Sequence, residues 1–181
     1  MDEKILYESL RNKSELLGVA CSDVAMVASI SEQRLWLFNN GKSYKHYPMS
    51  SSKRTPSCLE NSLGTPWGLH EICRKIGEGS PVGMVFEGRE PTGKRYWEYP
   101  LEQHTKNLIT TRILRLRGLE QGLNLGENCD THDRYIYIHG TNHEDVVGKP
   151  ASSGCLQLSN ANVIELFDLV PEGSHLLILR D

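Results

Sequence analysis

The segment Tyr135-Ile-Tyr-Ile-His139-Gly140-Thr141 is followed, after a short spacer, by Gly148-Lys-Pro-Ala-Ser152-Ser153-Gly154-Cys155-Leu156. Apolar residues alternate through the first segment, which predicts a strand that ends on His139. Cys155 comes sixteen residues after that histidine and directly follows Gly154, so a tight turn is expected to carry the thiol. A histidine held by a strand and a cysteine exposed by a turn are a common way to deliver a nucleophile and its base.

Cys155 and His139 are the predicted catalytic pair. The thiolate is the reactive form of cysteine, and a nearby imidazole can take up the thiol proton. His139 is therefore predicted to be the general base. Its second ring nitrogen needs an orienting acceptor, which the sequence does not identify, and a main-chain carbonyl near Gly140 could serve. Glycine lets consecutive main-chain N–H groups converge, so the N–H groups of Ser153, Gly154 and Cys155 are predicted to form an oxyanion hole. The alternative is structural, because an isolated cysteine is most often a small buried apolar residue.

These residues also carry a family resemblance. His139-Gly140-Thr141, then Gly148, then Ser152-x-Gly154-Cys155 resemble the signature of the YkuD family of L,D-transpeptidases, which is His-Gly-Thr followed by Ser-His-Gly-Cys-Ile-Arg. Upstream, Gly64-Thr65-Pro66-Trp67-Gly68 is similar to the Thr-Pro-x-Gly segment of that family. The resemblance implies a mostly β fold, a mixed β-sandwich with short helices.

Two positions depart from the family signature. Ser153 stands where the family usually has histidine, and Gln157 stands where it often has arginine. The first change leaves the main-chain N–H groups in place, whereas the second removes a positive charge that could hold a substrate carboxylate. Other cations could hold it, namely Arg112, Arg115, Arg117 and Arg134. The substrate-binding residues that the resemblance implies are Ser152, Ser153, Gln157, Thr141, Tyr137 and His143.

The resemblance also implies an activity on peptidoglycan. Members of the family attack the amide between the third residue of a tetrapeptide stem and its terminal D-alanine, so that the cysteine is acylated and D-alanine leaves. Water then gives an L,D-carboxypeptidase reaction, whereas an amine gives a 3-3 cross-link or an exchanged D-amino acid. We expect the L,D-carboxypeptidase of murein recycling, acting on a tetrapeptide or muropeptide through a Cys155 acyl-enzyme. The alternatives are an L,D-transpeptidase and a catalytically silent muropeptide-binding protein.

A metal site is another possible use of the same residues. His132, His139, His143 and Cys155 are potential ligands, with His139 and His143 four positions apart. That spacing brings two ligands to one face only in a helix, and Gly140-Thr141-Asn142 is a poor helix former. Neither a metal nor a cofactor is expected.

Composition bounds the class of protein and its surroundings. A chain of 181 residues with a net charge of −3 and 24% charged residues indicates one folded domain without a nucleic-acid partner. Its apolar runs are too short for a bilayer, so no membrane partner is expected. The N-terminal segment lacks the basic and apolar regions of an export signal, which favours the cytoplasm, with the periplasm as the alternative if such a signal was removed. Five scattered cysteines favour a reducing compartment over a disulfide framework.

Hydrophobic periodicity predicts a helix over residues 3–17, within a helical extension (1–22) that packs on a catalytic domain (23–181). A second helix is predicted to start at the cap Ser159-Asn160 and to stop before Pro171. The aromatic segment 87–103 is expected to be an irregular loop, either a binding lid or a segment pinned down by its own side chains. Strands are predicted over residues 26–30, 33–38, 43–49, 69–76, 84–86, 108–117, 134–139 and 175–179, and the last of these is expected to close the sheet.

Overall fold

A ten-stranded mixed sheet forms the body of the protein in the computed structural model, which describes residues 1–180. The strands are β1 (Val24–Ser29), β2 (Arg34–Asn39), β3 (Lys42–Pro48), β4 (Gly68–Ile76), β5 (Met84–Glu87), β6 (Glu90–Arg95), β7 (Ile109–Gly118), β8 (Tyr137–Gly140), β9 (Leu156–Leu158) and β10 (His175–Leu179). Their order is β3-β2-β1-β10-β4-β7-β5-β6, and β8 branches from β7 and carries β9. The β1–β10 and β8–β9 pairs are parallel and the other pairs are antiparallel. The predicted mostly β fold with a mixed sheet is confirmed.

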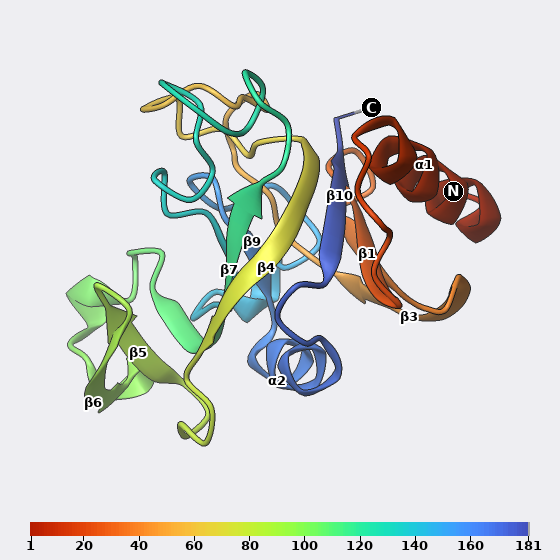
Figure 1. The fold of residues 1–181 in the computed structure, drawn as a ribbon. Helices are drawn as coiled ribbons and strands as arrows, with labels where there is room; N and C mark the ends of the chain where they lie inside the picture. Colours follow the sequence, from red (N-terminus) through yellow and green to blue (C-terminus); the bar gives the residue numbers. More distant parts are fainter. Residues whose placement is uncertain (181) are drawn as a thin grey trace.

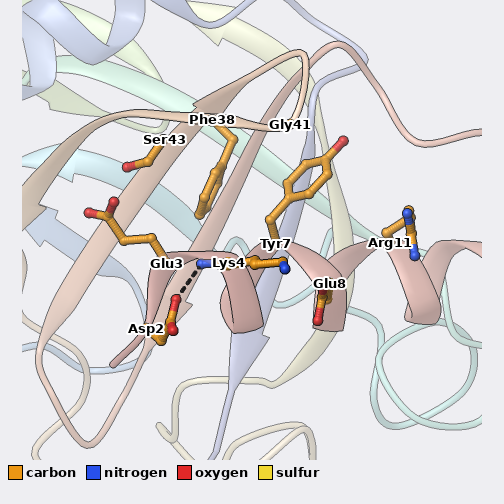
Figure 2. A pocket seen from close by; sticks show the side chains of 9 residues that line it. All are labelled: Asp2, Glu3, Lys4, Tyr7, Glu8, Arg11, Phe38, Gly41 and Ser43. Carbon is orange, nitrogen blue, oxygen red and sulfur yellow. Dashed lines mark hydrogen bonds between the residues drawn. The ribbon is translucent and has the colours of Figure 1, made fainter.

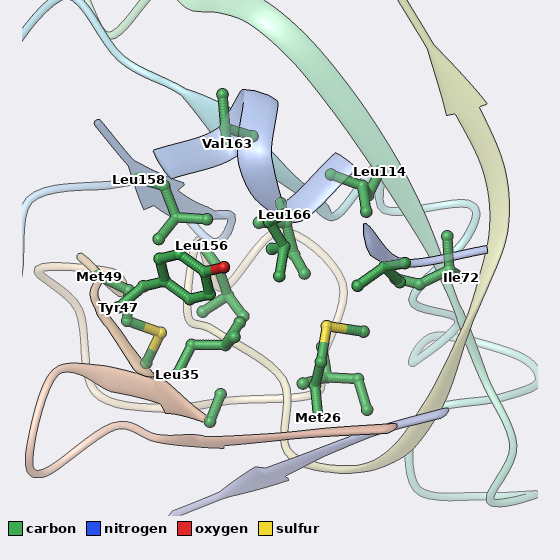
Figure 3. Close-up of a cluster of buried hydrophobic side chains, with 14 of the residues drawn as sticks. Met26, Leu35, Tyr47, Met49, Ile72, Leu114, Leu156, Leu158, Val163 and Leu166 are labelled. Atoms are coloured by element: carbon green, nitrogen blue, oxygen red, sulfur yellow. The ribbon is translucent and has the colours of Figure 1, made fainter. Parts of the chain in front are cut away.

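The main hydrophobic core lies on one face of the strands β1, β2, β3 and β10, which form one of its sides. Alternate residues of each strand face it, as Met26 does from β1 and Ile178 from β10. The other side is closed by β7, β8, β9 and the helix α2 (Asn160–Leu169), which contributes Val163 and Leu166 (Figure 3). The short strands β8 and β9 therefore show one face to the core, through Ile138 and Leu156, and the opposite face to the functional site.

The predicted N-terminal helix is confirmed as α1 (Glu3–Leu16). Asp2 caps it by accepting a hydrogen bond from the Lys4 N–H at 2.8 Å. Leu6 and Leu10 are buried against the outer face of β1 and β10, on the side away from the main core. Figure 1 shows α1 next to these two strands. Lys13 adds an ion pair of 3.0 Å with Glu120, whose second oxygen accepts from the Leu69 N–H.

The second predicted helix is also confirmed. The Ser159 side chain caps α2 by accepting from the Asn162 N–H, and the helix ends at Leu169, two residues before Pro171. Neither α1 nor α2 has the length and apolar character that a helix needs to cross a bilayer.

The prediction for residues 87–103 is wrong in part. The segment contains β6, which pairs with β5 in a hairpin, followed by two 3-10 turns (Tyr96–Glu98 and Leu101–Gln103). The ring of Trp97 lies directly against Gly83 and leaves no room for a side chain there. The aromatic residues therefore help to pin this segment to the hairpin. Figure 1 shows the β5–β6 hairpin at the end of the molecule opposite α1.

Three further strands differ from the sequence prediction. The strand expected over 134–139 begins only at Tyr137, because Tyr135 has a φ of 56°, outside the range of a strand. The three-residue strand β9 was not predicted at all. β10 was expected to close the sheet, yet it lies inside it, between β1 and β4.

Candidate active site

The pairing of β8 with β9 brings His139 and Cys155 to the same face of the sheet. His139 pairs with Gln157 in parallel register, so Cys155, two residues earlier, lies level with Tyr137. Residues two apart on a strand share a face, and the Cα atoms of His139 and Cys155 are then on the order of 8 Å apart, from the usual rise and strand spacing. That separation is within the combined reach of an imidazole and a thiol.

Main-chain groups just before and at the start of β8 hold the thiol of Cys155. Its sulfur accepts a hydrogen bond from the Tyr137 N–H at 3.4 Å and donates to the Tyr135 carbonyl at 3.6 Å. The left-handed conformation of Tyr135 presents that carbonyl at the point where the strand starts. Because a thiol has one proton, it must leave the Tyr135 carbonyl before it can donate to an imidazole.

His139 is almost completely buried, and one ring nitrogen is committed. Its Nδ1 lies 2.7 Å from the carbonyl oxygen of Gly140, which requires the proton on Nδ1 because a carbonyl only accepts. Nε2 is then the nitrogen with a free lone pair. This is the tautomer that a general base needs, and the carbonyl near Gly140 is the orienting acceptor considered from the sequence.

Burial keeps both members of the pair neutral at rest. It raises the pKa of the Cys155 thiol to about 11, although the Tyr137 N–H and the positive charge of Arg134 favour the thiolate. Burial also lowers the pKa of His139 to about 4, against a smaller opposing effect of its bond to Gly140. The site therefore holds a thiol and an imidazole, and the proton has to move during attack on a carbonyl.

The turn before Cys155 is built by Ser152. Its hydroxyl donates to the Cys155 carbonyl at 2.6 Å and accepts from the Gly154 N–H at 3.2 Å. Gly154 has a φ of 129°, a conformation that favours glycine. Within residues 1–180, the N–H groups of Ser153 and Cys155 have no hydrogen-bond acceptor. These two donors, more than that of Gly154, are available to an oxyanion.

Gly140 is required by packing behind the histidine. A Cβ at this position would lie 2.7 Å from both the Asn160 side-chain oxygen and the Thr110 carbonyl. Asn160 in turn accepts from the Thr110 hydroxyl at 2.6 Å and donates to the Thr141 carbonyl at 2.9 Å. This buried network fixes the main chain on both sides of the carbonyl that orients His139.

The predicted substrate-binding residues occupy different environments. Ser153 is exposed two residues before the thiol, and Tyr137 is buried with its hydroxyl bound by Arg89. Thr141 is fully buried and caps the next turn, and His143 binds the His104 carbonyl. Gln157 is 1% exposed, and its side-chain oxygen has no hydrogen-bond partner among the described residues.

The four arginines that could replace the charge missing at Gln157 have different partners in the structure. Arg112 binds the carbonyls of Ser80 and Thr111, and Arg117 pairs with Glu71. Arg134 acts on the Cys155 thiol through its charge, and the guanidinium of Arg115 lies 5.5 Å from the centre of the Tyr135 ring. A fifth arginine, which sequence analysis missed, lies 5.2 Å from the centre of the same ring. Arg89 reaches from the β5–β6 turn to the Tyr137 hydroxyl at 3.3 Å. No local sequence signal marks it, since only the folded hairpin brings it to the site.

A small hollow of about 220 Å³ borders the thiol turn at Ser153. Its wall is formed by the side chains of Glu60, Asn61, Leu63, Asp133, Arg134, Tyr135 and Ile136. A larger hollow of about 530 Å³ lies between α1 and the β2–β3 hairpin, where Tyr7 packs on Phe38 among exposed charges (Figure 2). All its lining residues come from residues 2–43, so it is separate from the catalytic candidates.

The structure does not assemble the metal ligands considered from sequence. Within residues 1–180, only Asp130, His132 and Asp133 form a group whose ligand atoms lie within 4.8 Å of one another. The guanidinium of Arg115 lies 3.3 Å from the His132 Nδ1, where it would repel a cation.

Comparisons with known proteins indicate the family of this chain. A family model, YkuD, the L,D-transpeptidase catalytic domain, matches residues 23–178. The chain is 45% identical over 58 residues to YqjB of Bacillus subtilis, a protein named as a candidate L,D-transpeptidase, and the match covers 32% of this chain and 33% of that protein. It is 46% identical over 43 residues to YkuD of the same organism, which is named in the same way, with 24% and 26% covered. These matches span about a third or less of the relatives.

Two solved structures share the fold. An L,D-transpeptidase from Mycobacterium smegmatis has a TM-score of 0.55 at 20% identity, with 87% of this chain and 58% of that chain covered. The L,D-transpeptidase LdtMt1, solved in complex with imipenem, has a TM-score of 0.56 at 22% identity, with 87% and 59% covered.

Proposed function

Because the chain belongs to the L,D-transpeptidase catalytic domain family, we propose that it is an L,D-carboxypeptidase that removes the terminal D-alanine from peptidoglycan tetrapeptide stems. The observation that carries the chemistry is the thiol of Cys155 held by main-chain groups beside His139, whose Nε2 lone pair is free. The finer statements, hydrolysis and the identity of the substrate, are our proposal.

In the first half-reaction, the Cys155 sulfur attacks the carbonyl carbon of the third stem residue while its proton passes to His139 Nε2. The carbonyl oxygen becomes an oxyanion, which the N–H groups of Ser153 and Cys155 can stabilise. When the carbonyl re-forms, the C–N bond to D-alanine breaks and His139 returns the proton to the leaving amine. The products are a thioester on Cys155 and free D-alanine.

In the second half-reaction, water takes the place of the leaving amine. His139 removes a proton from water, the hydroxide adds to the thioester, and the C–S bond breaks to regenerate the thiol and release a tripeptide. Two departures from the family signature support water as the acceptor. Gln157 offers no positive charge to a second stem, and Ser153 leaves a small polar side chain at the entrance.

The proposal includes a cytoplasmic role in which the substrate is a recycled tetrapeptide or muropeptide. An odd number of scattered cysteines supports a reducing compartment.

Mass spectrometry of a purified disaccharide-tetrapeptide incubated with the protein tests the proposal. We expect loss of D-alanine to give the tripeptide, with little exchange product when a D-amino acid is added in excess. Cys155→Ala should abolish product, and Cys21→Ala is the matched control because Cys21 packs in the separate hydrophobic cluster that contains Leu6 and Leu10 of α1.

Other outcomes would assign other functions. Efficient exchange of the D-amino acid, or dimer formation, would identify an L,D-transpeptidase instead. Binding of the muropeptide with unchanged mass under every condition would identify a catalytically silent binding protein.

A further inference from the structure

A cation on the β5–β6 hairpin reaches the residues that hold the catalytic thiol. Arg89 donates from Nη1 to the Tyr137 hydroxyl at 3.3 Å, and its guanidinium lies 5.2 Å from the centre of the Tyr135 ring. The main chain of the same two tyrosines makes the hydrogen bonds to Cys155 Sγ. Arg89 therefore contacts the side chains of both residues whose main chain holds the thiol, although it is far from Cys155 in the sequence.

The backbone at Arg89 is unusual for an arginine. Glu87 pairs with Glu90, so Gly88 and Arg89 form a two-residue turn, with φ values of 56° and 74°. Positive φ at both positions is the pattern of a type I′ turn, which favours glycine or asparagine at the second position. In this conformation the Cβ of a larger residue crowds the neighbouring carbonyl oxygen, so the arginine is strained. An arginine at such a position points to a use for its side chain.

The guanidinium of Arg89 has donors to spare. Of its five N–H groups, one is used by Tyr137 among the described residues, and no carboxylate forms an ion pair with it there. Arg134 instead gives three hydrogen bonds to groups of Ser57, Ser62 and Gly64. Arg115 is held by His132.

A charge is also missing on the other side of the thiol. Gln157 is neutral and buried at the position where the family often has arginine. It can offer an amide to the substrate but no charge. A guanidinium that binds a carboxylate with two parallel N–H bonds gives both strength and orientation, and Arg89 can provide such a pair.

Building on the proposed function, we propose that Arg89 binds a carboxylate of the stem peptide next to the scissile amide. Two carboxylates have this chemistry, the terminal one of D-alanine and one on the side chain of the third residue. In this arrangement the hairpin, and not the strand after the cysteine, selects acidic stems.

The test is a binding cycle that does not depend on turnover. In the Cys155→Ala background, calorimetry would measure the Kd of the free tetrapeptide, of its C-terminal amide, and of the peptide amidated on the third residue. Each peptide would be measured with Arg89 retained, with Arg89→Gln and with Arg89→Lys. The matched control is Arg95→Gln, which removes the same charge from the same hairpin at a side chain that lies over Trp97.

We expect Arg89→Gln to weaken binding of the free peptide by roughly 10- to 100-fold, the range of a charge-assisted contact. Arg89→Lys should recover part of this loss, and Arg95→Gln should change Kd less than about twofold, as for an exposed charge. The amide that removes the bound carboxylate should bind equally well whether Arg89 is retained or replaced by glutamine, which identifies the carboxylate.

Equal weakening of all three peptides, no weakening, or no peptide binding at all would overturn the role of Arg89. The proposed function is judged separately, by release of D-alanine from the protein that retains Cys155. Turnover with no effect of Arg89→Gln would retain the enzyme and reject the arginine. Selective binding without turnover would retain the role of Arg89 and reject the enzymatic function.

Discussion

The protonation state of Cys155 gives the sharpest prediction for the candidate active site. With a pKa of about 11, only about one thiol in 10⁴ is ionised at pH 7, against about 3% for an unperturbed cysteine. The higher pKa makes each thiolate more nucleophilic, which restores roughly tenfold in rate. Alkylation of Cys155 by iodoacetamide at pH 7 should therefore be roughly 30-fold slower than that of a free cysteine.

The pH dependence is the diagnostic quantity. Because ionisation limits the reaction, the alkylation rate should rise about tenfold per pH unit between pH 6 and pH 9. Rates would be followed by peptide mass spectrometry, which separates Cys155 from the other four thiols, with Cys155→Ala as the blank. A rate that stays flat from pH 5 to pH 8 would refute the neutral pair, because a thiolate–imidazolium pair would already be ionised over that range.

Replacement of His139 should affect alkylation by iodoacetamide and acylation by a carbapenem differently. Iodoacetamide reacts with the thiolate, which forms by loss of the thiol proton to solvent. His139→Gln should therefore leave the pH dependence of the alkylation rate unchanged. A carbapenem must be attacked while the proton moves, so the same variant should acylate roughly 10²- to 10⁴-fold more slowly. Equal acylation rates with and without the imidazole would remove His139 from the role of base.

Three further predictions concern stability and packing. Burial holds the pKa of His70 at about 4, so below about pH 6.5 the unfolded chain binds a proton at this residue and the folded chain does not; the unfolding free energy should therefore fall by about 2 kcal/mol between pH 7 and pH 4.5. In urea titrations at the two pH values, His70→Gln should lose about 2 kcal/mol less than the unchanged protein. An equal loss in both proteins would contradict a buried neutral ring. Gly140→Ala should destabilise the fold by about 1–3 kcal/mol and slow carbapenem acylation, because the added methyl meets Asn160 and a carbonyl; an unchanged Tm would show that the network can open. Leu10→Ala should cost about 2–5 kcal/mol in chemical denaturation and Ile5→Ala, on the exposed face of the same helix, less than about 0.5, so that similar values would mean α1 is not docked as described.

Much of the fold follows from local signals in the sequence. The cap at Ser159 and the stop at Pro171 fix α2, and the spacing of Leu6 and Leu10 fixes α1. The failures have physical causes. Strand β6 has the sequence Glu-Pro-Thr-Gly-Lys-Arg, with no apolar alternation, and its pairing with β5 makes it a strand. β9 has only three residues, too few to show a period.

In the candidate site, too, the features that involve sequence neighbours could be predicted and those that involve distant residues could not. The hydrogen bond of His139 to the Gly140 carbonyl and the turn at Cys155 both involve neighbours in sequence. The sequence predicted the turn and offered a carbonyl near Gly140 as one possible acceptor. The environments of Thr141 and His143 depend on partners far along the chain, such as Asn160 and His104. Arg89 depends on a hairpin that periodicity did not reveal, so sequence analysis had no means of placing it against Tyr135 and Tyr137.

The insertion of β10 between β1 and β4 constrains how the protein is made. Ala25 pairs with His175, so β1 cannot pair with its parallel neighbour until almost the whole described chain has been synthesised. At typical elongation rates of about 5–20 residues per second, that interval is on the order of 10–30 s. Until β10 is made, β1 lacks its parallel neighbour, and β4, once it is synthesised, lacks its partner on the same side. The candidate pair His139 and Cys155 is therefore synthesised before the strand that joins the two parts of the sheet.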